Sequence, residues 1–304
     1  MSAQIIMDGL IAGSMIGLGA IGITLTYSIL RFANFAHGDM ISWAAYFALA
    51  TSTALGTLAP GLSQPLEPFS FGWSLPLGLL AAIICTGLLA LLVDWLLFAR
   101  LRIRGGAVII LVMAGFGAAL TLRSFLEFVF TSRPAYFTNA LQIAHPLFAG
   151  ARATTDQLLG LGVALVLVVL VHLALTRTAA GRAMRAVSEN QSLAGLAGVN
   201  VAKTIRIAWV FGAGLAAVAG VMAGLLVQIR PHMGHDLLLP LFAAAILGGI
   251  GSVPGAMIAG LIIGLAEAFC VQFIGAEWRA AVSFIVLIAI LLLRPQGLFG
   301  KKTT

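Results

Sequence analysis

Long runs of hydrophobic residues, separated by short polar segments, follow one another along almost the whole chain. Most of these runs reach the roughly 20 residues that an α-helix needs to cross a hydrocarbon core about 30 Å thick. Their hydrophobic residues are continuous and do not alternate with polar ones, which excludes a membrane β-barrel. The pattern predicts an all-α, polytopic membrane helical bundle with about nine transmembrane spans (eight to ten possible). They lie at about residues 5–29, 40–58, 73–98, 107–130, 157–175, 207–228, 237–252, 255–275 and 278–293.

The composition favours a membrane protein as well. Charged residues make up 9% of the chain and hydrophobic residues 61%, whereas a soluble domain has about 25% charged residues. The net charge of +7 is compatible with a nucleic-acid partner, but the basic residues lie in short loops, where they set membrane topology instead. We therefore expect the lipid bilayer as a partner and no nucleic acid, with residues 1–304 forming a single transmembrane domain.

The basic residues also predict the orientation. If all nine runs cross, twelve of the seventeen basic residues share one side, which the positive-inside rule assigns to the cytoplasm. The twelve are Arg31, Arg100, Arg102, Arg104, Arg177, Arg182, Arg185, Lys203, Arg206, Arg294, Lys301 and Lys302. The N-terminus is then outside, the C-terminus inside, and residues 57–72 and 131–156 form external loops. The short seventh run would, if re-entrant, put the C-terminal lysines outside, against this rule.

Two polar, glycine-containing segments interrupt the two halves of the chain: "NFAHGD" (34–39) and "GGIGSVPG" (248–255). Paired breaks in corresponding halves are typical of a transport pathway through a membrane protein. We expect 34–39 to form a glycine-broken element at the inner end of such a pathway, with Asn34 and His37 hydrogen-bonding across the bundle. We expect the second segment to form a tight return between the seventh and eighth spans. The pathway candidates are Asn34, Phe35, His37, Gly38, Asp39, Gly248, Gly249, Gly251, Pro254 and Glu267.

Ionisable residues inside the spans are costly in hydrocarbon and need partners. Arg123 and Glu127 lie four residues apart on one helix face, so we expect them either to pair with each other or to have a role in the pathway. Glu267 has no opposite charge within four residues, and we expect it to face the bundle or a water-filled cavity. Buried carboxylates are otherwise few and scattered, which argues against a proton or sodium relay.

Several kinds of chemistry have no motif in the chain. There is no G-x-x-x-x-G-K-[ST] phosphate loop, no H-E-x-x-H and no C-x-x-C. The chain therefore cannot hydrolyse ATP through a phosphate loop, and we expect no cofactor or metal on it. Cys85 and Cys270 both lie inside hydrophobic runs and are expected to be core residues, not a disulfide.

Four segments in the same order resemble a known family across nearly the whole chain. They are "LRFANFAHGDM", "RAVSENQSLAGLAGVNV", "AILGGIGSVPGAMIAGLIIGLAEAF" and "LLLRPQGLFG". Together they resemble the H-type permease subunit of Liv-type ABC importers, a group that handles branched-chain amino acids, urea, short amides and related carboxylates. The resemblance implies a transport subunit, not an enzyme, in the bacterial inner membrane, with a periplasmic N-terminus and a cytoplasmic C-terminus.

The resemblance also implies partners. Two separate ATPase subunits would bind ATP and magnesium, and a periplasmic binding protein would deliver substrate. A second permease, the paralogous M-type subunit, would complete the channel. The cytoplasmic loop 176–206 would be the coupling element, a short helix broken by glycines that inserts into the ATPase. Its candidate residues are Arg182, Arg185, Glu189, Asn190, Gly195 and Gly198.

Nothing in the sequence names the substrate, so a branched-chain amino acid is expected only because it is the commonest in the family. Two other classes stay open. The first is an ion-coupled secondary transporter or channel for small polar solutes. The second is a membrane-embedded enzyme, which lacks a nucleophile and base, or paired carboxylates, at one membrane depth.

Overall fold

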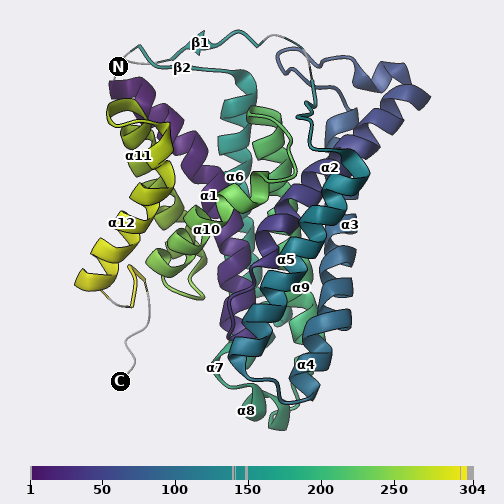
Figure 1. Ribbon diagram of the computed structural model, residues 1–304, viewed down its shortest axis with the longest axis vertical. Helices are drawn as coiled ribbons and strands as arrows, with labels where there is room; N and C mark the ends of the chain where they lie inside the picture. Colours follow the sequence, from purple (N-terminus) through teal and green to yellow (C-terminus); the bar gives the residue numbers. More distant parts are fainter. Residues whose placement is uncertain (1, 139, 141, 148–149, 295, 300–304) are drawn as a thin grey trace.

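The computed structural model of the protein describes residues 2–138, 140, 142–147, 150–294 and 296–299 (Figure 1). Each of the nine hydrophobic runs contains one long helix. These helices are α1 (Ser2–Leu30), α2 (Ala36–Leu58), α3 (Ser74–Val93), α5 (Val108–Phe130), α6 (Thr155–Arg177), α9 (Val201–Leu226), α10 (Met233–Gly248), α11 (Val253–Phe273) and α12 (Arg279–Leu293). The predicted polytopic helical bundle is therefore confirmed.

Shorter elements join the long helices. A π-helical segment, η2 (Asp94–Phe98), and α4 (Ala99–Ile103) extend α3. The 3-10 turns η1 (Pro60–Ser63) and η3 (Ala276–Trp278) lie in connections. Residues 176–206 form two short helices, α7 (Ala179–Glu189) and α8 (Gln191–Leu196), instead of the single one expected. A two-residue antiparallel pair, β1 (His145–Pro146) and β2 (Arg152–Ala153), lies in the loop 131–156.

Seven of the described helices are long and apolar enough to cross a membrane by length and composition. α10 is shorter, with 16 residues, and spans about 24 Å at 1.5 Å per residue. α2 has 23 residues but is more polar, because His37 and Asp39 lie in its first turn and serine and threonine residues follow along the helix. The two helices outside the seven are thus α2, which begins within the polar segment 34–39, and α10, which ends at the segment 248–255.

The centre of the bundle is formed by α1 and α9. In their most apolar 18-residue stretches, 72% and 78% of the residues are buried, against 17% in α5 and in α6. α1 packs antiparallel to α11 at backbone distance, since a Cβ added to Gly264 would lie 2.3 Å from the Cα of Gly13. Small residues allow such close approach between membrane helices, where van der Waals packing replaces the hydrophobic effect.

The two ends of the bundle differ. The N-terminal end of α1 lies beside β2, where the Gln4 side chain donates to the Arg152 carbonyl oxygen at 3.1 Å. The α7 and α8 helices lie at the opposite end, with α4 (Figure 1). Most of the basic residues in the described chain cluster at this α7–α8 end. Lys301 and Lys302, which the topology prediction also counts, lie outside the described residues.

The segment 31–35 turns back into the bundle. Arg31 has a φ of +61°, and the next residues run back along α1 until α2 begins at Ala36. His37 then contacts Gly22, eight residues before the end of α1, so α2 starts about 12 Å inside the bundle at 1.5 Å per residue. The interruption is thus an internal break and not a surface loop, but it lies at residues 31–35: the predicted glycine-broken element over 34–39 is wrong, because residues 36–39, Gly38 included, form the first turn of α2.

α10 also starts inside the bundle, where its first turn contacts the first turn of α2. A Cβ on Gly234 would lie 1.8 Å from the carbonyl oxygen of Gly38, and the Gly234 N–H donates to the Ser42 hydroxyl at 2.9 Å. The first turns of α2 and α10 therefore touch backbone to backbone. Gly38 and Gly234 are required at this crossing, since any side chain there would overlap the other helix.

Candidate functional site

The polar residues of the internal break are deeply buried. Asn34 and His37 are 3% and 1% exposed. The Asn34 side-chain oxygen accepts from the Ala36 N–H at 3.1 Å, a local bond that caps the turn two residues on. Asn34 therefore does not hydrogen-bond across the bundle as predicted. His37 does reach α1, through a backbone hydrogen bond at Gly19.

Two buried polar atoms at this break have no partner within the described residues: the Asn34 side-chain nitrogen Nδ2 and the His37 nitrogen Nε2. Buried polar atoms are normally hydrogen-bonded, so each unpartnered one needs a reason. The His37 ring fills the gap between α1 and α9, where the Cα hydrogens of Gly22 leave room for it. The break therefore combines tight packing with spare hydrogen-bonding capacity.

Asp39, in the first turn of α2, pairs with Arg123 of α5. The Arg123 Nε donates to Asp39 Oδ1 at 3.0 Å and Nη2 to Oδ2 at 3.4 Å. The two side chains are 1% and 13% exposed. The predicted Arg123–Glu127 pair is therefore wrong. α2 starts deep enough in the bundle for the Asp39 carboxylate to reach Arg123 on α5. This buried ion pair has two hydrogen bonds and is stronger than a pair four residues apart on one helix, which contributes about 0.2–0.5 kcal/mol. Glu127 instead pairs with His232, with Oε1 and Nε2 2.7 Å apart.

Glu267 is buried in α11, 1% exposed, and has two partners. Its carboxylate accepts from the Arg279 Nε and from the Ser283 hydroxyl, each at 2.6 Å. Both partners lie in α12, twelve and sixteen residues later in the chain. The expectation that Glu267 faces the bundle is confirmed, and the pair holds α11 against α12.

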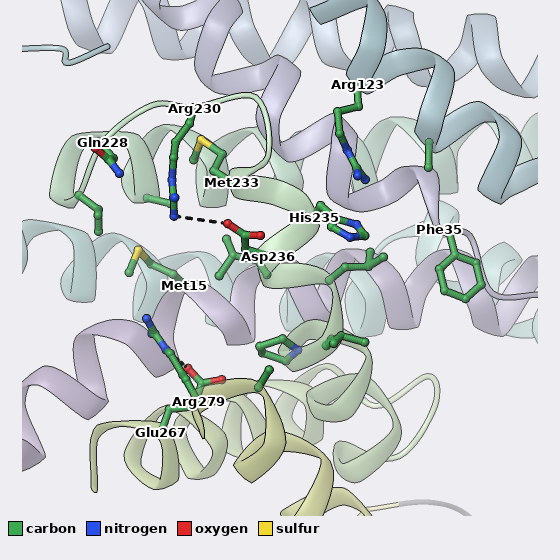
Figure 2. Close-up of a pocket in the computed structure, with 18 of the residues that line it drawn as sticks. Met15, Phe35, Arg123, Gln228, Arg230, Met233, His235, Asp236, Glu267 and Arg279 are labelled. Atoms are coloured by element: carbon green, nitrogen blue, oxygen red, sulfur yellow. Dashed lines mark hydrogen bonds and ion pairs between the residues drawn. The ribbon is translucent and has the colours of Figure 1, made fainter. Parts of the chain in front are cut away.

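A cavity of about 590 Å³ lies between α1, α5, α10 and the start of α12 (Figure 2). Its size falls in the range of pockets for small molecules. Met15 at the middle of α1 and Glu267 near the end of α11 both line it, so it occupies the half of the bundle toward the β1–β2 end. Hydrophobic side chains form much of the wall, including those of Leu120, Leu237 and Pro240.

Charged side chains of both signs face the same cavity: Arg123, Arg230, Asp236, Glu267, Glu277 and Arg279. Arg230 and Asp236 form an ion pair, with Nη2 and Oδ2 3.3 Å apart, and their side chains are 47% and 51% exposed. Figure 2 shows this pair in the cavity, with His235 between it and Arg123. A largely apolar chamber with exposed acidic and basic side chains suits a small zwitterion with a hydrophobic side chain.

Phe35 and Phe116 line the cavity at the end nearest the internal break, and Phe242 packs against Phe35. Phe35 lies at one end of the cavity in Figure 2. Its ring centroid is 5.3 Å from that of Phe242 in α10 and 6.3 Å from that of Phe116 in α5. Because each ring comes from a different segment, a relative movement of α5, α10 and the break would separate them.

The predicted pathway residues fall into three groups. Phe35 and Glu267 line the cavity, while Asn34, His37, Gly38 and Asp39 lie directly behind it at the start of α2. The glycines and proline of 248–255 form the α10–α11 turn instead, where Gly249 and Gly251 have φ values of +90° and +88°. This geometry confirms the predicted tight return between the two helices. The turn also contacts α1, since the Gly251 N–H donates to the Thr24 hydroxyl at 2.7 Å.

Sequence reasoning missed the pair Arg230–Asp236 and the role of Arg279 as the partner of Glu267. These residues flank short hydrophobic runs in the sequence, and they were assigned no role from the sequence. The sequence did contain a signal for them. The hydrophobic run that forms α10 is too short for the charged residues at its ends to reach the membrane surface.

The predicted coupling residues lie at the α7–α8 end, and three of them have structural roles there. The Asn190 side chain caps α8 by accepting from the Leu193 N–H at 3.0 Å. Gly198 has a φ of +86° after α8. The Arg185 guanidinium donates to the Leu175 carbonyl oxygen of α6. Arg182, Glu189 and Gly195 lie on the same two helices or at their ends. The most exposed apolar side chains of α8 are Leu193 and Leu196, at 63% and 86%.

A multi-pass helical bundle with a charged chamber beside an internal break defines a membrane transport subunit. The chain matches the model of the family described as branched-chain amino acid transport system / permease component over residues 5–291. It belongs to this family, and is a permease subunit of an ABC transport system and not an enzyme. A subunit of this kind works with ATPase and further permease partners.

Curated relatives agree with this assignment over almost their full lengths. The chain is 33% identical to the high-affinity branched-chain amino acid transport system permease protein LivH of Escherichia coli (strain K12), over 98% of this chain and 95% of that one. It is 33% identical, with the same coverage, to BraD of Pseudomonas aeruginosa. It is 29% identical to a probable LivH of Methanocaldococcus jannaschii, over 98% and 92%.

One similar solved structure is PsaBC from Streptococcus pneumoniae in complex with Fab. The TM-score is 0.51 at 15% sequence identity, and the match covers 95% of this chain and 91% of that one. At this identity the likeness concerns the fold alone.

Proposed function

We propose that this chain is the H-type permease subunit of an importer that carries a branched-chain amino acid across the bacterial inner membrane. The observation that carries the proposal is the cavity, whose hydrophobic wall and exposed Arg230–Asp236 pair match both parts of such a substrate. The 33% identity to LivH over 98% of the chain supports the same substrate class. The N-terminus and the β1–β2 end face the periplasm in this proposal, and the C-terminus and the α7–α8 end face the cytoplasm.

The cavity receives the amino acid from a periplasmic binding protein. Asp236 attracts the ammonium group and Arg230 the carboxylate, while Leu120 and Leu237 contact the aliphatic side chain. Exchanging an intramolecular ion pair for two pairs with the ligand keeps every charge compensated, which a site away from bulk water requires.

The inner end of the cavity is the gate. Phe35, Phe116 and Phe242 form a hydrophobic constriction, and such constrictions block polar solutes because they exclude water. The gate opens when α5 moves relative to the break and α10. Asp39 and Arg123 tie α2 to α5 at this point, so the same movement is transmitted to the start of α2.

The driving force comes from two cytoplasmic ATPase subunits, which bind ATP and magnesium. α7 and α8 form the coupling element, and the exposed Leu193 and Leu196 fit a hydrophobic groove on an ATPase. One residue of each helix connects this element to the bundle: the Ser188 carbonyl oxygen of α7 accepts from the Arg31 guanidinium, and the Gln191 side chain of α8 donates to the Ile29 carbonyl oxygen. A displacement of α7 and α8 therefore reaches the end of α1 and the break behind it. The second permease subunit is the paralogous M-type chain.

The test is uptake of radiolabelled leucine into proteoliposomes that hold the complete transporter with its binding protein. Uptake should require ATP on the ATPase side and should survive collapse of the ion gradients. The chain alone should move nothing against a gradient. Concentrative, ion-driven uptake by the lone chain would instead establish a secondary transporter, and transport of urea or an amide but not leucine would overturn the substrate.

A further inference from the structure

The helix formed by α3 and its extension is longer than the hydrocarbon core. α3, η2 and α4 follow one another without interruption from Ser74 to Ile103, a length of 30 residues, or about 45 Å at 1.5 Å per residue. The hydrocarbon core accounts for about 30 Å of this length. About ten residues of the helix therefore lie beyond the core, in the layer of lipid headgroups.

Two exposed tryptophans mark where this helix enters and leaves the hydrocarbon. Trp73 directly precedes α3 and Trp95 lies in η2, and they are 58% and 60% exposed. Their separation in the helix corresponds to about 33 Å, close to the thickness of the core. Tryptophan is enriched at both membrane–water interfaces. The part of the helix that follows Trp95 therefore lies among the headgroups, at the α4 end.

The exposed face between the two tryptophans is suited to lipid tails. Ser74–Val93 contains no charged residue, so hydrocarbon can cover this face without leaving a charge unsolvated. Trp95 follows Leu92 by three residues and Leu88 by seven, which is the spacing of one helical face. Large apolar side chains that are 42% to 64% exposed form this face: Leu77, Leu80, Ile84, Leu88 and Leu92.

A charged side chain lies over the ring that ends this face. The Arg100 guanidinium carbon Cζ is 5.1 Å from the centroid of the Trp95 ring. η2 is π-helical, and the hydrogen bonds of a π-helix join residues five apart. Trp95 and Arg100 have this separation, so the local π-helix places the guanidinium over the indole. The attraction between a cation and an aromatic face holds it there.

Positive charge at this point is not balanced by carboxylates in the same part of the chain. Asp94 is the only acidic residue between positions 68 and 126, and its Oδ1 already pairs with Arg102 Nη2 at 2.8 Å. Arg104 lies one turn after Arg100, since its N–H donates to the Arg100 carbonyl oxygen at 3.2 Å. The two side chains therefore share one side of the helix, and both are exposed. An anion from outside this segment can bind both guanidinium groups.

We infer that Trp95, Arg100 and Arg104 form a binding site for the headgroup phosphate of an anionic phospholipid such as phosphatidylglycerol. Guanidinium groups bind phosphate through two parallel N–H···O bonds. The acyl chains of the same lipid lie along Leu88 and Leu92. This continuity with the apolar face favours a lipid over free phosphate or a soluble protein, neither of which would cover that face. In the proposed orientation the site faces the cytoplasmic leaflet, whose anionic lipids attract basic residues.

Photo-crosslinking of the complete transporter in nanodiscs tests the site. The discs consist of phosphatidylcholine with a small, equal content of a phosphatidylglycerol or a phosphatidylcholine probe, each with the same diazirine near its glycerol. After irradiation, adducts on peptides that cover residues 94–104 are quantified by mass spectrometry. The phosphatidylglycerol probe should give about tenfold more adduct, the size expected from two arginines beside an anionic headgroup. Unlabelled phosphatidylglycerol should compete with the probe, and inorganic phosphate should not.

Two double variants remove the same amount of charge. Arg100→Gln with Arg104→Gln should abolish the preference for the phosphatidylglycerol probe. Lys203→Gln with Arg206→Gln removes two exposed positive charges from α9 at the same end of the bundle, and should keep the preference. Trp95→Leu keeps an apolar side chain but no longer holds Arg100 in place, and should reduce the preference part of the way.

The inference is overturned if the parent shows no preference for the phosphatidylglycerol probe, or if inorganic phosphate competes as well as the lipid. It is also overturned if both double variants lose the preference equally, because the effect would then reflect net charge. Labelling that occurs only after the ATPase subunits are removed would instead identify this face as an ATPase contact. Should the Arg100 and Arg104 double variant not assemble, Arg100→Gln is compared with Arg206→Gln, and the same outcomes decide. The labelling does not depend on the transported substrate, so its failure leaves the proposed function intact.

Discussion

The buried ion pair between Asp39 and Arg123 offers a sharp test of how α2 is held inside the bundle. In Arg123→Met, the Asp39 carboxylate, 1% exposed, loses both of its donors. Breaking a buried pair by removing one partner costs about 3–5 kcal/mol, because an uncompensated charge stays behind. Asp39→Asn should cost less, about 1–3 kcal/mol, because Arg123 lines the cavity and can turn toward it.

The double variant, Asp39→Asn with Arg123→Met, leaves no charge at either position. Replacing a buried pair with neutral side chains is often close to neutral, so the double variant should be more stable than Arg123→Met alone. The expected coupling between the two substitutions is about 3 kcal/mol, the upper end for residues in direct contact.

The assay is the free energy of unfolding from a denaturant titration in mixed micelles, measured for the parent, both single variants and the double variant. The half-exposed pair Arg230–Asp236 is the matched control, and breaking it should cost at most about 1 kcal/mol. If Arg123→Met lies within about 1 kcal/mol of the parent, or if the two costs simply add, the pair does not hold α2 to α5.

Four further substitutions test the break, the gate and the coupling element. His37→Leu should abolish uptake and leave membrane insertion intact, because leucine fills the space without hydrogen bonding; unchanged uptake would remove the role of His37. Gly22→Ala should destabilise the bundle by about 1–3 kcal/mol through overpacking, since its Cβ would lie 2.8 Å from the His37 ring. The control is Gly117→Ala, which has open space around it and should be neutral in the same unfolding titration. Phe35→Ala should let labelled leucine leak through the transporter without ATP, and a leak-free variant would argue against the aromatic gate. Leu193→Glu should uncouple ATP hydrolysis from uptake while the bundle unfolds at the parent temperature, and normal coupling would exclude α8 from the ATPase contact.

Sequence reasoning placed the helices well because hydropathy is a local property. Each hydrophobic run became one helix, and the segments 34–39 and 248–255 lie where α2 and α11 begin. Of these two segments only 34–39 lies beside the cavity, because 248–255 forms the turn between α10 and α11. Sequence reasoning failed for Arg123, whose partner was sought four residues along the same helix. The actual partner, Asp39, is 84 residues away, and nothing in the local pattern records that distance.

The chain by itself determined that this is a helical membrane protein, where its helices lie and which family it belongs to. These follow from residue order alone, since a helix in lipid must satisfy its own backbone and display apolar side chains. Only the tertiary structure decided that α2 and α10 both begin inside the bundle, touching at Gly38 and Gly234. The depth at which a helix starts depends on what packs beside it. That depth brings Asp39 to Arg123 and leaves Arg230 and Asp236 exposed in a chamber formed by distant parts of the chain.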